Sequence, residues 1–170
     1  MQATTVKLYS IGYREMRAYI IAALFVVGNI VLPQLCHLIP QGGLIWLPIY
    51  FFTLVAAYKY GWKVGLLTAV LSPVVNHLLF GMPAAAMLPV ILMKSTLLAF
   101  IAAFVARRAG RVSLLLILCV VLGYQVFGCA IESIIHGSVY AGAQDFRMGL
   151  HGMALQVLGG YLVIKYLLRS

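Results

Sequence analysis

Long apolar runs, each about the length of a membrane-spanning helix, dominate this sequence. One of them, ILCVVLGYQVFGCAIESII, extends over residues 117–135 with a single charged residue. The run does not alternate polar and apolar residues, as a strand of a membrane barrel does. Inside lipid, a segment that is not part of a barrel must satisfy its own backbone hydrogen bonds, and only a helix does so. We therefore predict an all-α membrane protein.

The composition supports the same class. Of the 170 residues, 64% are hydrophobic and 9% are charged, and the mean hydropathy is +1.06. Soluble domains hold roughly 25% charged residues, so this chain cannot cover a water-facing surface with polar groups. At about 20 residues a span, the length fits roughly six helices with short loops and no soluble domain. We expect a single integral membrane domain over residues 1–170.

Six apolar runs are bounded by charged residues or by glycine and proline. They cover residues 18–38, 44–58, 64–80, 84–106, 113–135 and 150–167. Of the twelve basic residues, all except Lys94 and Arg147 lie before the first run, between the second and third, between the fourth and fifth, or at the end of the sixth. The positive-inside rule then places both termini in the cytoplasm. It also explains the net charge of +9 without a nucleic-acid partner.

Most of the remaining polar residues fall on the opposite, outer side in this topology. All four histidines lie there, together with two of the three acidic residues: His37, His77, His136, His151, Glu132 and Asp145. The connections on that side are short and almost uncharged. This grouping predicts a polar pocket in the outer half of the bundle, covered by loops.

Lys94 is the basic residue that lies deepest in an apolar run. It follows Ala84 by ten residues, which places it roughly 15 Å along its helix and near the middle of a hydrocarbon core about 30 Å thick. A lysine there costs about 2.5–3.5 kcal/mol, so it must face the bundle interior and have a partner. The partner is either Glu132 or an anionic ligand. We favour ligand contact over a purely structural ion pair, and Glu132 could serve in both ways.

Two glutamines also lie within apolar runs. Gln125 and Gln156 need partners from the protein or from a ligand, because a buried, unpaired amide is costly. Trp46, Tyr50 and Tyr140 lie toward the outer interface, where an aromatic belt is the default assignment and stacking on a heteroaromatic ligand is the alternative.

The outer helix ends supply further candidates for ligand contact. Asn76 and His77 end the third run, where a cap or interfacial role and a ligand contact are equally supported. For His136 and His151, an interfacial role is favoured over a ligand contact.

No pattern in the sequence indicates a metal site, a cofactor or catalysis. The histidines are singletons on separate segments, and the three cysteines are scattered without CxxC spacing. We find no serine–histidine, paired-acid or HExxH arrangement, and no P-loop GxxxxGK[ST]. The chain is therefore not expected to be an enzyme, and it carries no ATP-binding motif of this kind.

Several short motifs occur together in one order along the chain. They are Tyr60-Gly61, Gly65-Leu66-Leu67, Leu71-Ser72-Pro73 and Gly81-Met82-Pro83, followed by Gly152 and Gln156 in the last run. In this order and spacing the chain resembles the substrate-binding S-components of energy-coupling factor (ECF) vitamin transporters. The resemblance covers essentially the whole sequence and agrees with the six-helix count.

The resemblance implies a function. S-components reside in the bacterial cytoplasmic membrane and bind a small water-soluble vitamin or precursor near the outer surface. They deliver it by associating with a transmembrane coupling subunit and two cytoplasmic ATPase subunits. Small residues on the first helix often meet the coupling subunit; in this sequence Ala18 and Ala22 have the matching spacing.

Two departures from the family pattern affect the ligand. Lys94 replaces a frequent acidic residue, and His151 replaces a frequent proline. The lysine favours an anionic, pantothenate-like ligand, although uncharged ring vitamins of the pyridoxine kind stay open. The alternative function is a structural membrane protein of cell-shape or assembly type, which would need no transported ligand.

Overall fold

A computed structural model describes residues 8–167, and for His136, Ala141, Asp145 and Leu167 it describes the backbone alone. Lys7 and Arg169, two of the basic residues used for the topology, lie outside this range. Within it the chain is helical and contains no strand. The elements are α1 (Met16–Cys36), α2 (Gly42–Trp46), the 3-10 turn η1 (Pro48–Tyr50), α3 (Phe51–Tyr60), α4 (Trp62–Phe80), α5 (Leu88–Ala109), α6 (Leu114–His136), α7 (Val139–Gly142), α8 (Gln144–Met148), α9 (Leu150–Leu162) and the π-helical turn η2 (Val163–Leu167).

Four of these helices, α1, α4, α5 and α6, are long and apolar enough to cross a membrane. They correspond to the first, third, fourth and fifth predicted runs. The prediction of an α-helical, multi-pass membrane protein is therefore confirmed for these four helices. Helix α3 has 10 residues, fewer than the about 17 that a span requires, and α9 has 13 residues but continues directly into η2. Six spans with cytoplasmic termini therefore stay a prediction.

The second predicted run, residues 44–58, is not one helix. Leu47 adopts a left-handed conformation with a φ of 44° and separates α2 from η1 and α3. The cause is Pro48, because a proline disfavours helical geometry in the residue before it and cannot donate a backbone hydrogen bond. The prediction of an unbroken helix was wrong at this position.

The fourth predicted run also begins later than expected. Helix α5 begins at Leu88, with Pro89 in its first turn, where a proline is tolerated because that N–H has no helical partner. Lys94 therefore lies six residues into the helix, or roughly 9 Å from its start at 1.5 Å per residue. It is closer to the end of the bundle than the sequence predicted.

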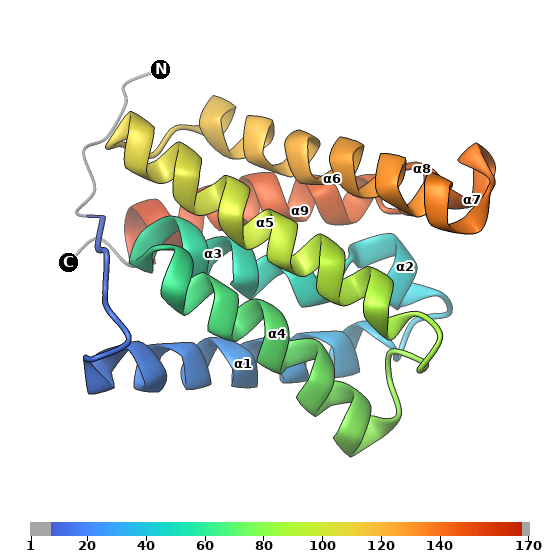
Figure 1. Ribbon diagram of the computed structural model, residues 1–170, viewed down its shortest axis with the longest axis horizontal. Helices are drawn as coiled ribbons and strands as arrows, with labels where there is room; N and C mark the ends of the chain where they lie inside the picture. Colours follow the sequence, from blue (N-terminus) through green and yellow to red (C-terminus); the bar gives the residue numbers. More distant parts are fainter. Residues whose placement is uncertain (1–7, 168–170) are drawn as a thin grey trace.

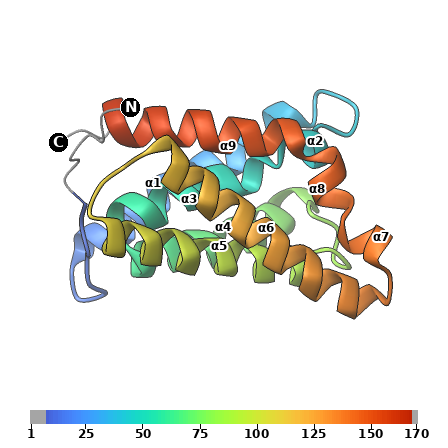
Figure 2. The same cartoon turned by 90° about the horizontal axis from the view of Figure 1, so that it is seen from above.

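The bundle has two chemically different ends, visible at the two sides of Figures 1 and 2. At one end, which we call the basic end, α3 meets α4 and α5 meets α6, and the helix ends and connections there carry Lys59, Lys63, Arg107, Arg108 and Arg111. At the opposite end, which we call the covered end, lie α2, α7, α8 and the connection 81–87.

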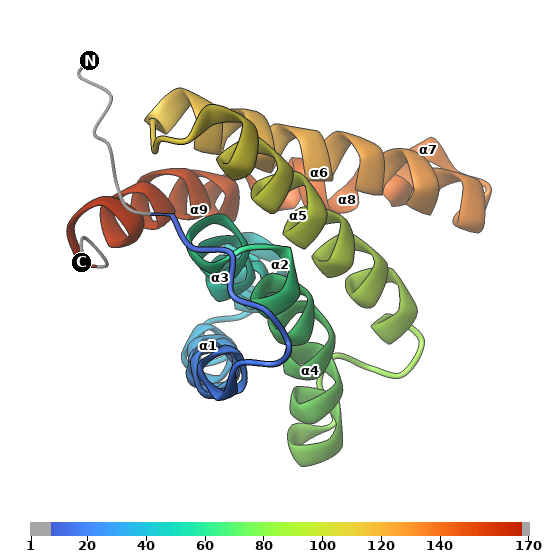
Figure 3. The same ribbon diagram turned by 60° about the vertical axis from the view of Figure 1, so that its left-hand side comes forward.

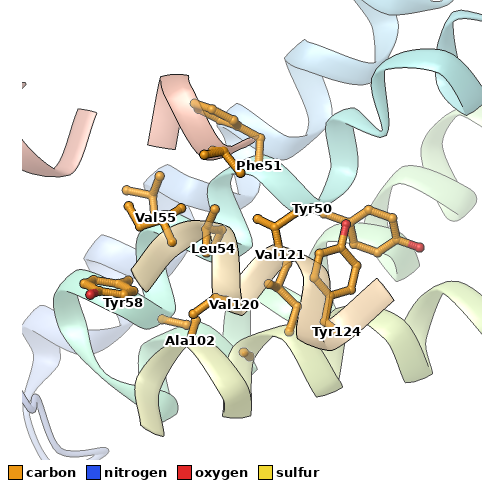
Figure 4. Close-up of a cluster of buried hydrophobic side chains, with 14 of the residues drawn as sticks. Tyr50, Phe51, Leu54, Val55, Tyr58, Ala102, Val120, Val121 and Tyr124 are labelled. Carbon is orange, nitrogen blue, oxygen red and sulfur yellow. The ribbon is translucent and has the colours of Figure 1, made fainter. Parts of the chain in front are cut away.

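The hydrophobic core lies between α3, α5, α6 and α9. Leu54 and Val55 of α3 pack near Val120 and Val121 of α6 (Figure 4). Helices α3 and α4 approach closely because Gly65 has no side chain, and a Cβ there would collide with Ala57. The core thus holds α5 and α6 together along the face that carries the buried polar residues.

Candidate functional site

The most unusual feature of the bundle interior is a buried ion pair between two helices. The ammonium group of Lys94 on α5 contacts a carboxylate oxygen of Glu132 on α6, and the two side chains are 0% and 6% exposed. Two opposite charges brought together in this way offset much of the cost of burying either one. The structure therefore confirms Glu132 as a partner of Lys94.

A glycine on α6 creates room for the lysine. A Cβ at Gly128 would lie 2.9 Å from Cγ of Lys94, closer than real Cβ contacts allow. Gly128 precedes Glu132 by one helical turn, so both lie on the same face of α6. The alkyl chain of Lys94 passes over Gly128, and its ammonium group then reaches Glu132.

Two further polar side chains in the same pair of helices lack partners. Both amide atoms of Gln125 on α6 and the hydroxyl of Ser95 on α5 are buried without a hydrogen bond. Both residues are 0% exposed. A buried polar group without a partner costs roughly 1–3 kcal/mol, so these positions have unused capacity to donate and accept hydrogen bonds. Gln125 was a predicted candidate, whereas Ser95 was missed.

Gln156, the other predicted glutamine, has protein partners. The hydroxyl of Tyr124 donates to Oε1 of Gln156 at 2.9 Å, and Nε2 of Gln156 donates to the carbonyl of Leu47 at 3.4 Å. The ring of Tyr124 also lies 5.5 Å from that of Tyr50 (Figure 4). Gln156 therefore ties α9 to α6 and to the break between α2 and η1, a structural role.

The covered end is held closed by small residues. Gly152 of α9 packs directly on the carbonyl of Trp46, where any Cβ would collide, and the rings of Trp46 and His151 lie 6.1 Å apart. Gly142 of α7 packs in the same way on Ser133 of α6, one residue from Glu132. These contacts place α2 and α7 over the end of the bundle that contains the ion pair.

Asn76 and His77 occupy a different place. Oδ1 of Asn76 accepts a hydrogen bond from Nε2 of Gln34 at 3.1 Å, and Nδ1 of His77 lies 2.7 Å from the carbonyl oxygen of Pro83. Asn76 and His37 line a cavity of about 280 Å³ between α1, α2 and the connection 81–87. Lys94 and Glu132 do not line this cavity. The predicted residues thus divide between two locations at the covered end.

The remaining predicted positions differ in outcome. His151 is exposed, and its ring lies tilted against that of Trp46. The side chain of His136 lies outside the described part of the chain. Among the described residues, no three histidines, cysteines or acids converge as metal ligands would.

The expected partner interface on α1 is not exposed. Ala18 and Ala22 are 0% and 2% exposed and pack with Ala56 and Val64 inside the bundle. Their small side chains let α1 approach α3 and α4, the same close packing that had been expected against a partner. In this arrangement of the chain the two alanines therefore contact the bundle itself, and an interface with a partner subunit stays a prediction.

A polar network centred on Asn29 of α1 was not predicted from the sequence. Its amide nitrogen donates to the hydroxyls of Thr53 and Ser72, each at 3.1 Å. Its amide oxygen accepts from the backbone N–H of Phe52 at 3.1 Å. That N–H belongs to the first turn of α3 and has no partner within its own helix. A lone asparagine in an apolar run is the signal that could have identified it.

The chain matches no protein-family model, and comparisons with curated proteins and with solved structures give no significant match.

Proposed function

We propose that this chain is the substrate-binding S-component of an ECF-type importer for a small, water-soluble vitamin or vitamin precursor with an anionic group. The observation that carries the proposal is the buried ion pair of Lys94 and Glu132, together with the unpartnered amide of Gln125 on α6 and the unpartnered hydroxyl of Ser95 on α5, a set that we call the Lys94 cluster. Gln125 precedes Glu132 by seven residues, so both lie on the same face of α6. If the ion pair only stabilised the packing of the helices, it would need no other polar groups near it. The unpartnered groups of Gln125 and Ser95 on the same two helices are what a ligand would require.

The chemistry of the cluster matches a particular kind of ligand. Lys94 provides a cation that a carboxylate or phosphate of the ligand can contact, and in a buried setting such a contact is stronger than at a surface. The amide of Gln125 both donates and accepts, and Ser95 adds a hydroxyl. An organic acid that also carries hydroxyl or amide groups, such as pantothenate, satisfies all of these groups together.

Access to the cluster requires movement at the covered end. Lys94 and Gln125 are both 0% exposed, so a ligand reaches them only when α7 or α2 moves away. The contacts of Gly142 and Gly152 involve no buried ion pair, so opening this end separates no charges. In the proposed cycle, the cover opens to admit the ligand and closes over it.

Transport against a gradient needs an energy source from elsewhere, because the sequence has no P-loop. The partners proposed are a transmembrane coupling subunit and two cytoplasmic ATPase subunits. In the bacterial cytoplasmic membrane, the basic end would then face the cytoplasm and the covered end the outside.

Isothermal titration calorimetry on the purified chain in detergent tests the proposal. The panel contains pantothenate, other carboxylate-bearing vitamins, and pyridoxine as an uncharged ring. Stoichiometric binding of one compound that is lost in the double variant Lys94→Met/Glu132→Met is the expected result. A folded chain that binds no member of a broad vitamin panel and never co-purifies with ATPase subunits would instead support a structural membrane protein.

A further inference from the structure

A second, larger cavity lies at the basic end, away from the Lys94 cluster. It has a volume of about 620 Å³ and lies between the segment before α1, the end of α3 and the second half of α5. The residues that define its character are Tyr9, Trp62, Phe100, Phe104 and Arg107. Nothing in the proposed function uses it.

The segment before α1 is fixed in place as one wall of this cavity. The backbone N–H of Tyr9 donates to the carbonyl of Lys59 at 2.8 Å, and that of Ile11 donates to Tyr60 at 3.3 Å. Figure 3 shows this segment crossing the ends of α3 and α4. The cavity is therefore bounded by ordered backbone on that side.

The opposite wall is apolar and reaches the outer surface of the bundle. Phe100 and Phe104 lie one turn apart on α5 and are 47% and 67% exposed. The ring of Trp62 stacks on that of Phe100 at 6.0 Å. Because α5 is a membrane-spanning helix, these exposed rings face acyl chains. An acyl chain can therefore lie along this wall.

The charge at the mouth of the cavity lacks a protein counter-charge. Arg107 lines the cavity one turn beyond Phe104, and in the described part of the chain the only ion pair is Lys94–Glu132. Among the residues that the structure describes, the only acidic one near this end is Glu15, which accepts a hydrogen bond from the N–H of Gly12. The guanidinium group of Arg107 is thus available to an anion from the surroundings.

We propose that this cavity binds one anionic phospholipid, with its phosphate on Arg107 and an acyl chain along Phe100 and Phe104. A guanidinium group binds phosphate oxygens in pairs, and basic pockets between membrane helices hold anionic headgroups. The aromatic ring of Trp62 lies at the first residue of α4, the depth at which tryptophan meets headgroups. This site does not depend on the proposed transport function.

Native mass spectrometry of the full chain, with phosphatidylglycerol or phosphatidylcholine added in turn, tests this site. Arg107→Gln is compared with Arg108→Gln, because both arginines are exposed neighbours but only Arg107 lines the cavity. Phe104→Ala is compared with Leu115→Ala, because both side chains are 67% exposed and only Phe104 lines the cavity.

We expect one phosphatidylglycerol bound in preference to phosphatidylcholine, with retention reduced about fivefold or more in Arg107→Gln and reduced in Phe104→Ala. The two matched controls should retain the lipid as the wild type does. Equal losses in Arg107→Gln and Arg108→Gln would mean diffuse attraction to the basic end and would overturn the proposal. Equal retention of the two lipids by the wild type would overturn it as well.

Discussion

The ammonium group of Lys94 on α5 meets the carboxylate of Glu132 on α6 inside the bundle, where their exposed fractions are 0% and 6%. Each charge offsets part of the free-energy cost of burying the other, so the burial of either residue depends on its partner. In the same two helices, the side chains of Gln125 and Ser95 are buried without hydrogen-bond partners.

Replacing one member of the pair should therefore lower the free energy of unfolding more than replacing both. Lys94→Met leaves the carboxylate of Glu132 buried without its cation, and we expect the free energy of unfolding to fall by about 3–5 kcal/mol. The double variant Lys94→Met/Glu132→Met should recover most of that loss, because apolar side chains of similar volume can replace a buried ion pair. Denaturant unfolding in micelles measures both. If the losses of the two single variants simply add in the double variant, the ion pair does not couple them.

The two glutamines within apolar runs should respond in opposite ways to the same substitution. Gln125→Leu removes an amide without partners, so stability should be unchanged or higher. Gln156→Leu breaks the hydrogen bonds with Tyr124 and Leu47 and should lower stability by about 1–3 kcal/mol. Thermal unfolding of the two variants side by side provides the comparison. A large loss in Gln125→Leu would show that its amide is used in the folded chain.

Asn29→Leu should destabilise the chain strongly. It leaves the N–H of Phe52 without its acceptor and the hydroxyls of Thr53 and Ser72 without their donor. Each buried group deprived of its partner costs roughly 1–3 kcal/mol. Ser95→Ala is the control, since its hydroxyl has no partner to lose. Similar unfolding midpoints for the two variants would contradict the role assigned to Asn29.

Two helix glycines should differ in how they accept a methyl group. In Gly65→Ala the new Cβ collides with Ala57 and forces α3 away from α4. We expect a loss of about 1–3 kcal/mol, as for other overpacked sites. In Gly123→Ala the nearest atom is 3.7 Å away on Ile101, which is an ordinary contact. Thermal unfolding should show a lower midpoint for Gly65→Ala alone, and equal midpoints would mean that α3 and α4 are not in close contact.

The predictable part of the fold was the long helices, because an apolar run of about 20 residues has few alternatives in lipid. A partner for Lys94 was predictable for a similar reason, since a charge inside an apolar run requires one, and Glu132 was one of the two candidates. The break in the helix at Leu47 was not predictable, because the packing around Pro48 decides whether a proline starts a new helix or is accommodated within one.

Small and uncharged residues were the least predictable. Ala18 and Ala22 have a spacing that permits close approach, but the spacing does not say whether α1 approaches its own bundle or a partner. Ser95 and Asn29 carry no charge, so their positions in apolar runs require a partner less strongly than that of Lys94 and do not say which residue supplies one. Their roles depend on tertiary contacts between residues distant in sequence, such as Asn29 with Ser72.

The central claim is that the cluster around Lys94 binds an anionic small molecule. The most direct test is mass spectrometry of small molecules released from the purified chain, comparing the wild type with Lys94→Met/Glu132→Met. The double variant removes the charges without leaving either one unpaired, so a loss of ligand is not a loss of fold. We predict about one equivalent of one anionic compound from the wild type and none from the folded double variant. Equal amounts of the same compound from both proteins would contradict the claim.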